Sequence, residues 1–175
     1  MANAEGAGAV TCPLWNEAVL QRLDETKPDL VLTSAQTRIQ FLGPDGEASA
    51  QAASDGYAEQ WRTVEEMGIP VVVFEDTPRM HSKEIDCAAG ADPYSCGRSV
   101  EEAQEGQTGI LADAVEQVPG TVLVDFNDLL CTDDFCPTVV GHVIAYRDTS
   151  SHMTKTFTET LAPFMNERVT AVLAG

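Results

Sequence analysis

Two hydrophobic patterns alternate along the chain. In four segments, apolar residues recur at the spacing of one helix face, and these predicted helices span 15–26, 51–67, 99–117 and 155–173. Between them lie short apolar runs of the kind found in buried strands, and these predicted strands span 29–34, 69–74, 121–125 and 139–146. Because strands and helices alternate, we expect an α/β fold with a mostly parallel sheet.

Turn-forming residues separate these elements. Pro44-Asp45-Gly46 predicts a turn, Gly68 ends the second helix, and a long polar loop is expected at 75–98. A length of 175 residues is typical of one domain. We therefore expect an Ala/Gly-rich flexible leader at 1–10 and a single domain at 11–175.

The chain is strongly acidic. It has 10 Lys and Arg against 28 Asp and Glu, a formal net charge of −18. This charge argues against binding to nucleic acid or to an anionic membrane surface, which both require a basic patch. No apolar run approaches the ~18 residues of a membrane span. The first residues lack the features of a signal peptide, so we expect that the protein stays where it is made or that a segment was removed from its front.

Five cysteines form two pairs that are close in sequence, Cys87 with Cys96 and Cys131 with Cys136, and leave Cys12 over. Zinc binding and redox catalysis are the alternatives, but both usually use the Cys-x-x-Cys spacing, which is absent. Two short-range disulfides are favoured, each worth about 2–3 kcal/mol in the chain-entropy model. Disulfides persist in oxidising compartments, which favours an extracytoplasmic location.

Polar residues follow several predicted strands. In open α/β sheets, ligands bind outside the carboxyl ends of the strands, which draws attention to Ser34, Asp76 and Arg79. We treat these three as weak candidates for substrate binding. Strands also commonly end in polar residues, and Arg79 is equally suited to a surface salt bridge.

The richest candidate segment precedes the last helix. Asp148 is followed by His152, and an aspartate near a histidine can orient an imidazole that acts as a general base. The alternative is that Asp148 caps a turn while His152 is a solvated loop residue. Ser150 and Ser151 share this loop, and the backbone would have to fold sharply for His152 to activate either. Thr154 is suited to the N-cap of the last helix.

Most of the chain resembles the SGNH hydrolase-like domains that are fused to membrane acyltransferase-three proteins. The resemblance rests on CPLWNEAVLQRLDETKPDLVLTS (12–34), FLGPDG (41–46), VVVFEDTPRM (71–80), LLCTDDFCPTVVGHVIAYRDTSSHMT (129–154) and TFTETLAPFM (156–165). It implies a flavodoxin-like, three-layer SGNH fold. It also implies an extracytoplasmic domain, tethered to a membrane acyltransferase domain in the full-length protein, that modifies cell-envelope glycans with acyl groups.

By this resemblance, His152 is the catalytic base and Asp148 is its orienting carboxylate, and the cysteine pairs fall where such domains carry disulfides. The family usually has Asp-x-x-His, whereas Asp148 and His152 are four residues apart. A catalytic hydrogen bond of about 2.6–3.2 Å therefore requires the loop to absorb one extra residue.

The family's nucleophile is the serine of a Gly-Asp-Ser motif after the first strand, and no Gly-Asp-Ser occurs in this sequence. A lone serine at a strand end, such as Ser34, is more often a turn residue than a nucleophile. We therefore expect that the sheet lacks its first strand, that the chain alone is inactive, and that an unpaired strand edge promotes a homodimer or poor solubility.

These observations lead to three hypotheses about function. The first is an SGNH-type domain of an envelope O-acyltransferase or esterase, with an acyl donor and a glycan as partners. The second is a non-catalytic relative that binds a glycan or a protein, and the third is an intracellular flavodoxin-like domain with reduced cysteines. We expect no cofactor or metal, because no Gly-rich phosphate loop is present and Asp133-Asp134 is typical of a solvated turn.

Overall fold

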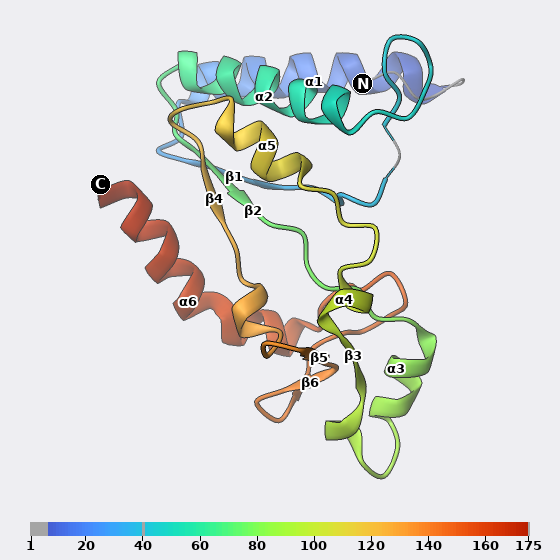
Figure 1. The fold of residues 1–175 in the computed structure, drawn as a ribbon. Helices are drawn as coiled ribbons and strands as arrows, with labels where there is room; N and C mark the ends of the chain where they lie inside the picture. Colours follow the sequence, from blue (N-terminus) through green and yellow to red (C-terminus); the bar gives the residue numbers. More distant parts are fainter. Residues whose placement is uncertain (1–6, 40, 175) are drawn as a thin grey trace. The chain divides into compact units, whose positions relative to one another are not determined.

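The computed structural model describes residues 7–39 and 41–174 (Figure 1). The chain divides into two compact units. The first comprises Met1–Glu75 and Thr108–Leu123, and the second comprises Asp76–Gln107 and Val124–Gly175. The first six residues of the predicted leader lie outside the described residues, and the single domain expected at 11–175 stays a prediction.

The first unit contains most of the parallel sheet and the helices that cover it. Its elements, with the strand that completes the sheet, are α1 (Ala7–Thr26), β1 (Val31–Ser34), α2 (Ala50–Glu66), β2 (Val71–Phe74), α5 (Ile110–Glu116) and β4 (Val122–Val124). The sheet has the order β1-β2-β4, and β1 pairs with β2 in parallel, from Val31 opposite Val71 to Ser34 opposite Phe74. The expected α/β class is confirmed.

The core of this unit forms around β2. Val71, Val72 and Val73 are completely buried, as a continuous β-branched run predicts for a central strand. Helix α2 packs against α5 and contributes Trp61 to the same core. The start of α2 is capped by Ser49, whose side chain accepts a hydrogen bond from the amide of Ala52 at 3.0 Å.

The second unit combines short hairpins with helices. Its elements are α3 (Ser82–Ala88), the 3₁₀ helix η1 (Pro93–Ser95), β3 (Gly97–Ser99), α4 (Val100–Ala103), the 3₁₀ helix η2 (Asn127–Leu129), β5 (Phe135–Pro137), β6 (Val139–Val140), β7 (Val143–Ile144) and α6 (Lys155–Ala174). Strand β3 pairs with β5, and β6 pairs with β7, both antiparallel. Met80, Leu130, Tyr146 and Phe157 are among the buried residues of its core.

Both expected disulfides are present. Cys87 is bonded to Cys96, and Cys131 is bonded to Cys136. Cys12 is a free, exposed cysteine in α1. Within the described parts of the chain, no helix combines the length and the apolar character that crossing a bilayer requires.

The predicted helix at 99–117 is wrong as one helix. Helix α4 ends at Ala103 and α5 begins at Ile110. Gly106 lies between them with a φ of +75°, a left-handed conformation that interrupts a helix and that glycine adopts without strain. The apolar spacing continues across the gap, so periodicity alone does not reveal the break.

The predicted strand at 139–146 is also wrong as one strand, because it forms the β6–β7 hairpin. Gly141 and His142 make the turn with φ values of +54° and +68°. The expected loop at 75–98 holds α3 and η1, and the β3–β5 pair was not predicted. The helix expected at 15–26 begins earlier, at Ala7.

Candidate functional site

A closed loop between β7 and α6 carries the predicted aspartate and histidine. We call residues 147–152 the relay loop. Tyr146 and Met153 flank it and form an antiparallel bridge, and the amide of Arg147 donates to the carbonyl of His152 at 2.7 Å. The two ends of the loop are therefore held side by side by backbone bonds.

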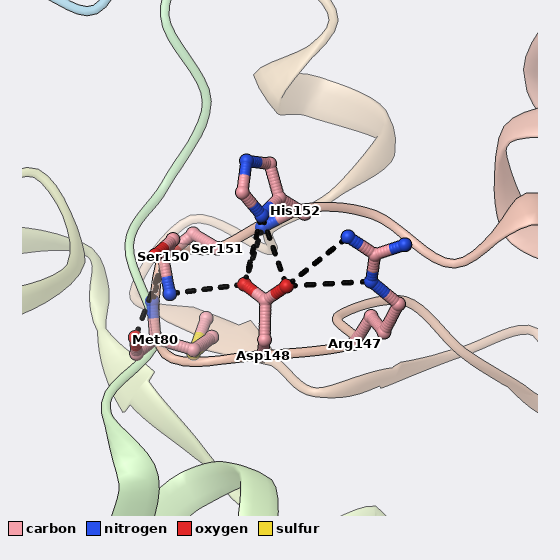
Figure 2. A network of polar contacts seen from close by, with 6 residues as sticks. All are labelled: Met80, Arg147, Asp148, Ser150, Ser151 and His152. Atoms are coloured by element: carbon pink, nitrogen blue, oxygen red, sulfur yellow. Dashed lines mark hydrogen bonds and ion pairs between the residues drawn. The ribbon is translucent and has the colours of Figure 1, made fainter.

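The side chains of Asp148 and His152 meet inside this loop (Figure 2). His152 Nδ1 lies 3.0 Å from Oδ1 and 2.9 Å from Oδ2 of Asp148. Ser151 has a φ of +63°, and its amide donates to the carbonyl of Asp148 at 2.9 Å. This left-handed residue tightens the loop, so that the longer spacing still brings the two side chains into hydrogen-bond distance.

The carboxylate of Asp148 is surrounded by donors. The amide of Ser150 donates to Oδ1 at 3.0 Å, and Nε and Nη2 of Arg147 donate to Oδ2, each at 3.3 Å. These donors stabilise the ionised form of the carboxyl group, and the bond to His152 is the largest cause. Together they lower the pKa of Asp148 to about 2. The carboxylate is therefore charged at neutral pH.

The hydrogen bond also decides which nitrogen of His152 carries a proton. An ionised carboxylate only accepts hydrogen bonds, so Nδ1 is the protonated nitrogen, and in the neutral ring Nε2 keeps its lone pair. The His152 side chain is 63% exposed, and Nε2 lies on the ring edge away from Asp148 (Figure 2). No described residue bonds Nε2, so the ring can accept a proton from a hydroxyl group brought to it.

A second contact joins the relay loop to the segment that follows β2. The amide of Met80 donates to Ser151 Oγ at 3.0 Å, and the Ser151 hydroxyl donates to the carbonyl of Met80 at 3.3 Å (Figure 2). The hydroxyl of Ser151 is therefore engaged with Met80 rather than with His152. The sequence did not predict this contact, because its two residues are 71 positions apart.

Asp76 lies at the start of the same segment. Its side chain accepts a hydrogen bond from the amide of Thr77 at 2.9 Å. Its carbonyl accepts from the side chains of Gln107 at 3.1 Å and of Asn127 at 3.2 Å. The structure thus brings together the ends of two predicted strands, at Asp76 and Asn127, through backbone as well as side-chain groups.

Arg79 directly precedes Met80, the residue whose backbone is bonded to the Ser151 hydroxyl. Its amide donates to the carbonyl of Ala103 at 2.7 Å, and its carbonyl accepts from the Arg98 side chain at 3.3 Å. The Arg79 guanidinium has no hydrogen bond or ion pair with any residue that the structure describes, so the surface salt bridge that we considered is not formed there.

Ser34 is the exposed last residue of β1 and belongs to the first unit, whereas the other candidate residues belong to the second. Its membership of a common site stays a prediction. Over the described ranges, no cluster of His, Cys, Asp and Glu side chains is arranged to hold a metal ion.

Comparison with known proteins agrees with these features. The family model for the SGNH domain that is fused to AT3 domains matches residues 2–167. No curated protein and no solved structure matches the chain. The family match covers most of the 175 residues and confirms the resemblance found in the sequence. The chain therefore belongs to the family of SGNH domains fused to AT3 domains.

Proposed function

We propose that this chain provides the proton-relay residues of an SGNH-type O-acyltransferase or esterase domain that acts on cell-envelope glycans. The observation that carries the proposal is the Asp148–His152 pair, in which Nδ1 is bonded at 2.9 Å, Nε2 has no partner among the described residues, and the His152 side chain is 63% exposed. An oriented imidazole with one free nitrogen is what a general base for a hydroxyl nucleophile requires.

In the proposed reaction, a serine hydroxyl attacks the carbonyl carbon of the acyl donor. His152 Nε2 takes the hydroxyl proton as the ester bond to serine forms, and then gives that proton to the leaving oxygen of the donor. Asp148 stabilises the imidazolium between the two steps. In the second half of the reaction, a glycan hydroxyl or water attacks the acyl-serine ester, and His152 Nε2 takes its proton. His152 then gives that proton to the serine oxygen, which leaves as the acyl group passes to the glycan or to water.

The nucleophile of this mechanism is not recognisable in the chain, because its 175 residues contain no Gly-Asp-Ser motif. We therefore propose that the serine comes from a segment outside these residues and that the chain alone does not turn over esters. Two disulfides support an extracytoplasmic location, since such bonds persist in oxidising compartments. The family's fusion supports a membrane acyltransferase domain as the covalent partner.

The proposal is tested first by reading the coding DNA upstream of residue 1. An in-frame Gly-Asp-Ser preceded by membrane-spanning segments is expected. The full-length protein should then transfer acyl groups, and His152→Ala should abolish the transfer, whereas His142→Ala, which changes an exposed hairpin histidine, should leave it intact. The isolated chain should give background hydrolysis of p-nitrophenyl acetate and no labelling by a fluorophosphonate. Robust labelling of the isolated chain, or full activity of the His152→Ala protein, contradicts the proposal.

The absence of Gly-Asp-Ser from these residues favours one alternative, a non-catalytic SGNH-like domain that binds a glycan or a protein. Under this alternative the upstream DNA encodes no nucleophile motif. Calorimetric titration with glycan fragments should then show binding that is unchanged in the His152→Ala protein.

A homodimer is a further part of the proposal. Strand β1 is at one edge of the described sheet, and the side chain of its residue Leu32 is 49% exposed. An unpaired edge of this kind can pair with another copy of itself. Light scattering of the isolated chain should give the mass of a dimer, and a well-behaved monomer at all concentrations contradicts this part.

A further inference from the structure

Among the residues that the structure describes, the relay loop has one side-chain tether to the rest of the second unit, at Ser151. The Ser151 hydroxyl both accepts from the amide of Met80, at 3.0 Å, and donates to its carbonyl, at 3.3 Å. Met80 is completely buried and belongs to the core of this unit. The tether therefore links the loop to a part of the backbone that tight packing holds in place.

The loop needs such a tether, because its two functional side chains are not held by burial. The side chain of His152 is 63% exposed and that of Asp148 is 36% exposed. The backbone at Ser151 also adopts a φ of +63°, which residues other than glycine rarely adopt unless neighbouring contacts impose it. The two hydrogen bonds to Met80 are contacts of this kind.

We propose that Ser151 is a positioning residue that keeps His152 Nδ1 against Asp148. It acts on the backbone turn that brings the two side chains together and does not touch a reacting atom. Removing its hydroxyl frees the turn, separates Asp148 from the imidazole for part of the time, and lets the ring proton move from Nδ1 to Nε2. An effect of Ser151 on catalysis rests on the proposed function, in which His152 is the general base.

The neighbouring residues do not supply this tether. Ser150 is exposed, and only its backbone amide, not its hydroxyl, bonds Asp148. Arg147 bonds Asp148 with a side chain that is itself 67% exposed, so it contributes charge but little restraint. Ser150→Ala is therefore a matched control, one residue from the proposed tether and with the same change of side chain.

The test compares Ser151→Ala, Ser151→Gly and Ser150→Ala in the 175-residue chain. Nitrogen-15 chemical shifts of the His152 ring at neutral pH report the ratio of the tautomer protonated at Nδ1 to that protonated at Nε2. We expect this ratio to fall about three- to tenfold in both Ser151 variants, as expected for the loss of one or two neutral hydrogen bonds. Ser150→Ala should keep the wild-type ratio.

Ser151→Ala removes only the hydroxyl but keeps a side chain at a positive φ, whereas Ser151→Gly removes the hydroxyl together with Cβ and accepts the positive φ without strain. A fall in both variants therefore reports the loss of the hydroxyl and not backbone strain. A wild-type tautomer ratio in a folded Ser151→Gly protein overturns the inference, as does an equal fall in Ser150→Ala. If neither Ser151 variant folds, NMR relaxation of the backbone amides in the wild-type protein tests whether the relay loop is rigid. The inference requires order parameters near 0.85 from residue 148 to residue 152, and values below about 0.6 overturn it.

This readout does not depend on catalysis. Failure of the proposed function, seen as full activity of the His152→Ala full-length protein, leaves the tautomer measurement unaffected. Conversely, a failed tautomer test rejects only the positioning role of Ser151. The roles of His152 and Asp148 are tested separately, by the activity of their variants.

Discussion

His152 Nδ1 contacts both carboxylate oxygens of Asp148, at 3.0 and 2.9 Å. Such a forked contact holds Nδ1 of the imidazole against the carboxylate, whose negative charge stabilises a positive charge on the ring. It forms across a spacing of four residues because the turn at Ser151 shortens the path between the two side chains.

Asp148 should titrate far below an ordinary aspartate. Its pKa is lowered to about 2, chiefly by the hydrogen bond from His152. The stability that Asp148 contributes is thus present above pH of about 4, the ordinary pKa of an unfolded aspartate, and is lost as the pH falls towards 2. A carbon-13 titration of the side-chain carboxyl should give a midpoint near 2.

In the His152→Ala protein, the pKa of Asp148 should rise towards its ordinary value. Arg147→Ala removes the weakest of the contributions and should raise it much less. A wild-type midpoint near 4, or equal shifts in the two variants, would mean that the imidazole does not hold the carboxylate.

Arg168 of α6 should stabilise the second unit. Its guanidinium donates to both carboxylate oxygens of Asp128, at 2.8 and 2.6 Å, and to the carbonyl of Asp125. It also lies 5.0 Å from the centre of the Phe126 ring. We expect Arg168→Ala to lower the free energy of unfolding by about 1–2 kcal/mol, the sum of a forked ion pair and a cation–π contact at a partly exposed site.

Urea denaturation measures this loss, and Arg22→Ala is its control. Arg22 forms an ion pair with Glu25 in which the two side chains are 74% and 52% exposed, so its replacement should change the free energy of unfolding by less than about 0.5 kcal/mol. The bond from Arg168 also lowers the pKa of Asp128, which should return to its ordinary range in the Arg168→Ala protein.

Alkylation should find one reactive thiol. Cys12 is free and exposed, and the other four cysteines are joined in two disulfides. Intact mass after iodoacetamide treatment under denaturing, non-reducing conditions should show a single adduct, and prior reduction should raise the number to five. Five adducts without reduction would instead support an intracellular protein with reduced cysteines.

Gly97 should not tolerate a side chain. A Cβ at this position would collide with the carbonyl oxygen of Cys136, across the β3–β5 pair, and would lie 2.6 Å from the Phe135 ring. Because a backbone atom cannot move aside cheaply, we expect Gly97→Ala to cost about 1–3 kcal/mol of stability. Thermal unfolding measures the loss.

Gly109→Ala is the matched control for Gly97. The nearest atom to its Cβ would be 3.8 Å away, an ordinary contact distance. Its stability should change by less than about 0.5 kcal/mol, because a weaker helix cap and a stiffer unfolded chain oppose each other. Equal effects of the two substitutions would show that the close approach of β3 and β5 is not the cause of the stability loss in the Gly97→Ala protein.

The elements that could be predicted are those with a strong local pattern. The apolar run at β2 and the spaced apolar residues of α2 mark their elements because burial on a strand or on one helix face imposes that pattern directly. The break at Gly106 and the turn at Gly141 could not be predicted, because glycine fits both regular elements and turns. The pairing of β3 with β5 joins segments about forty residues apart, and no local pattern encodes it.

The sequence by itself determined the class of the fold, the family, the two cysteine pairs and the identity of the Asp148–His152 pair, because these depend on residue types and on short spacings. Only the tertiary structure decided that the two side chains meet across four residues and that Ser151 ties their loop to Met80. The reason is that a loop's path depends on backbone conformation and on contacts with residues distant in the chain, and the spacing of the motif determines neither.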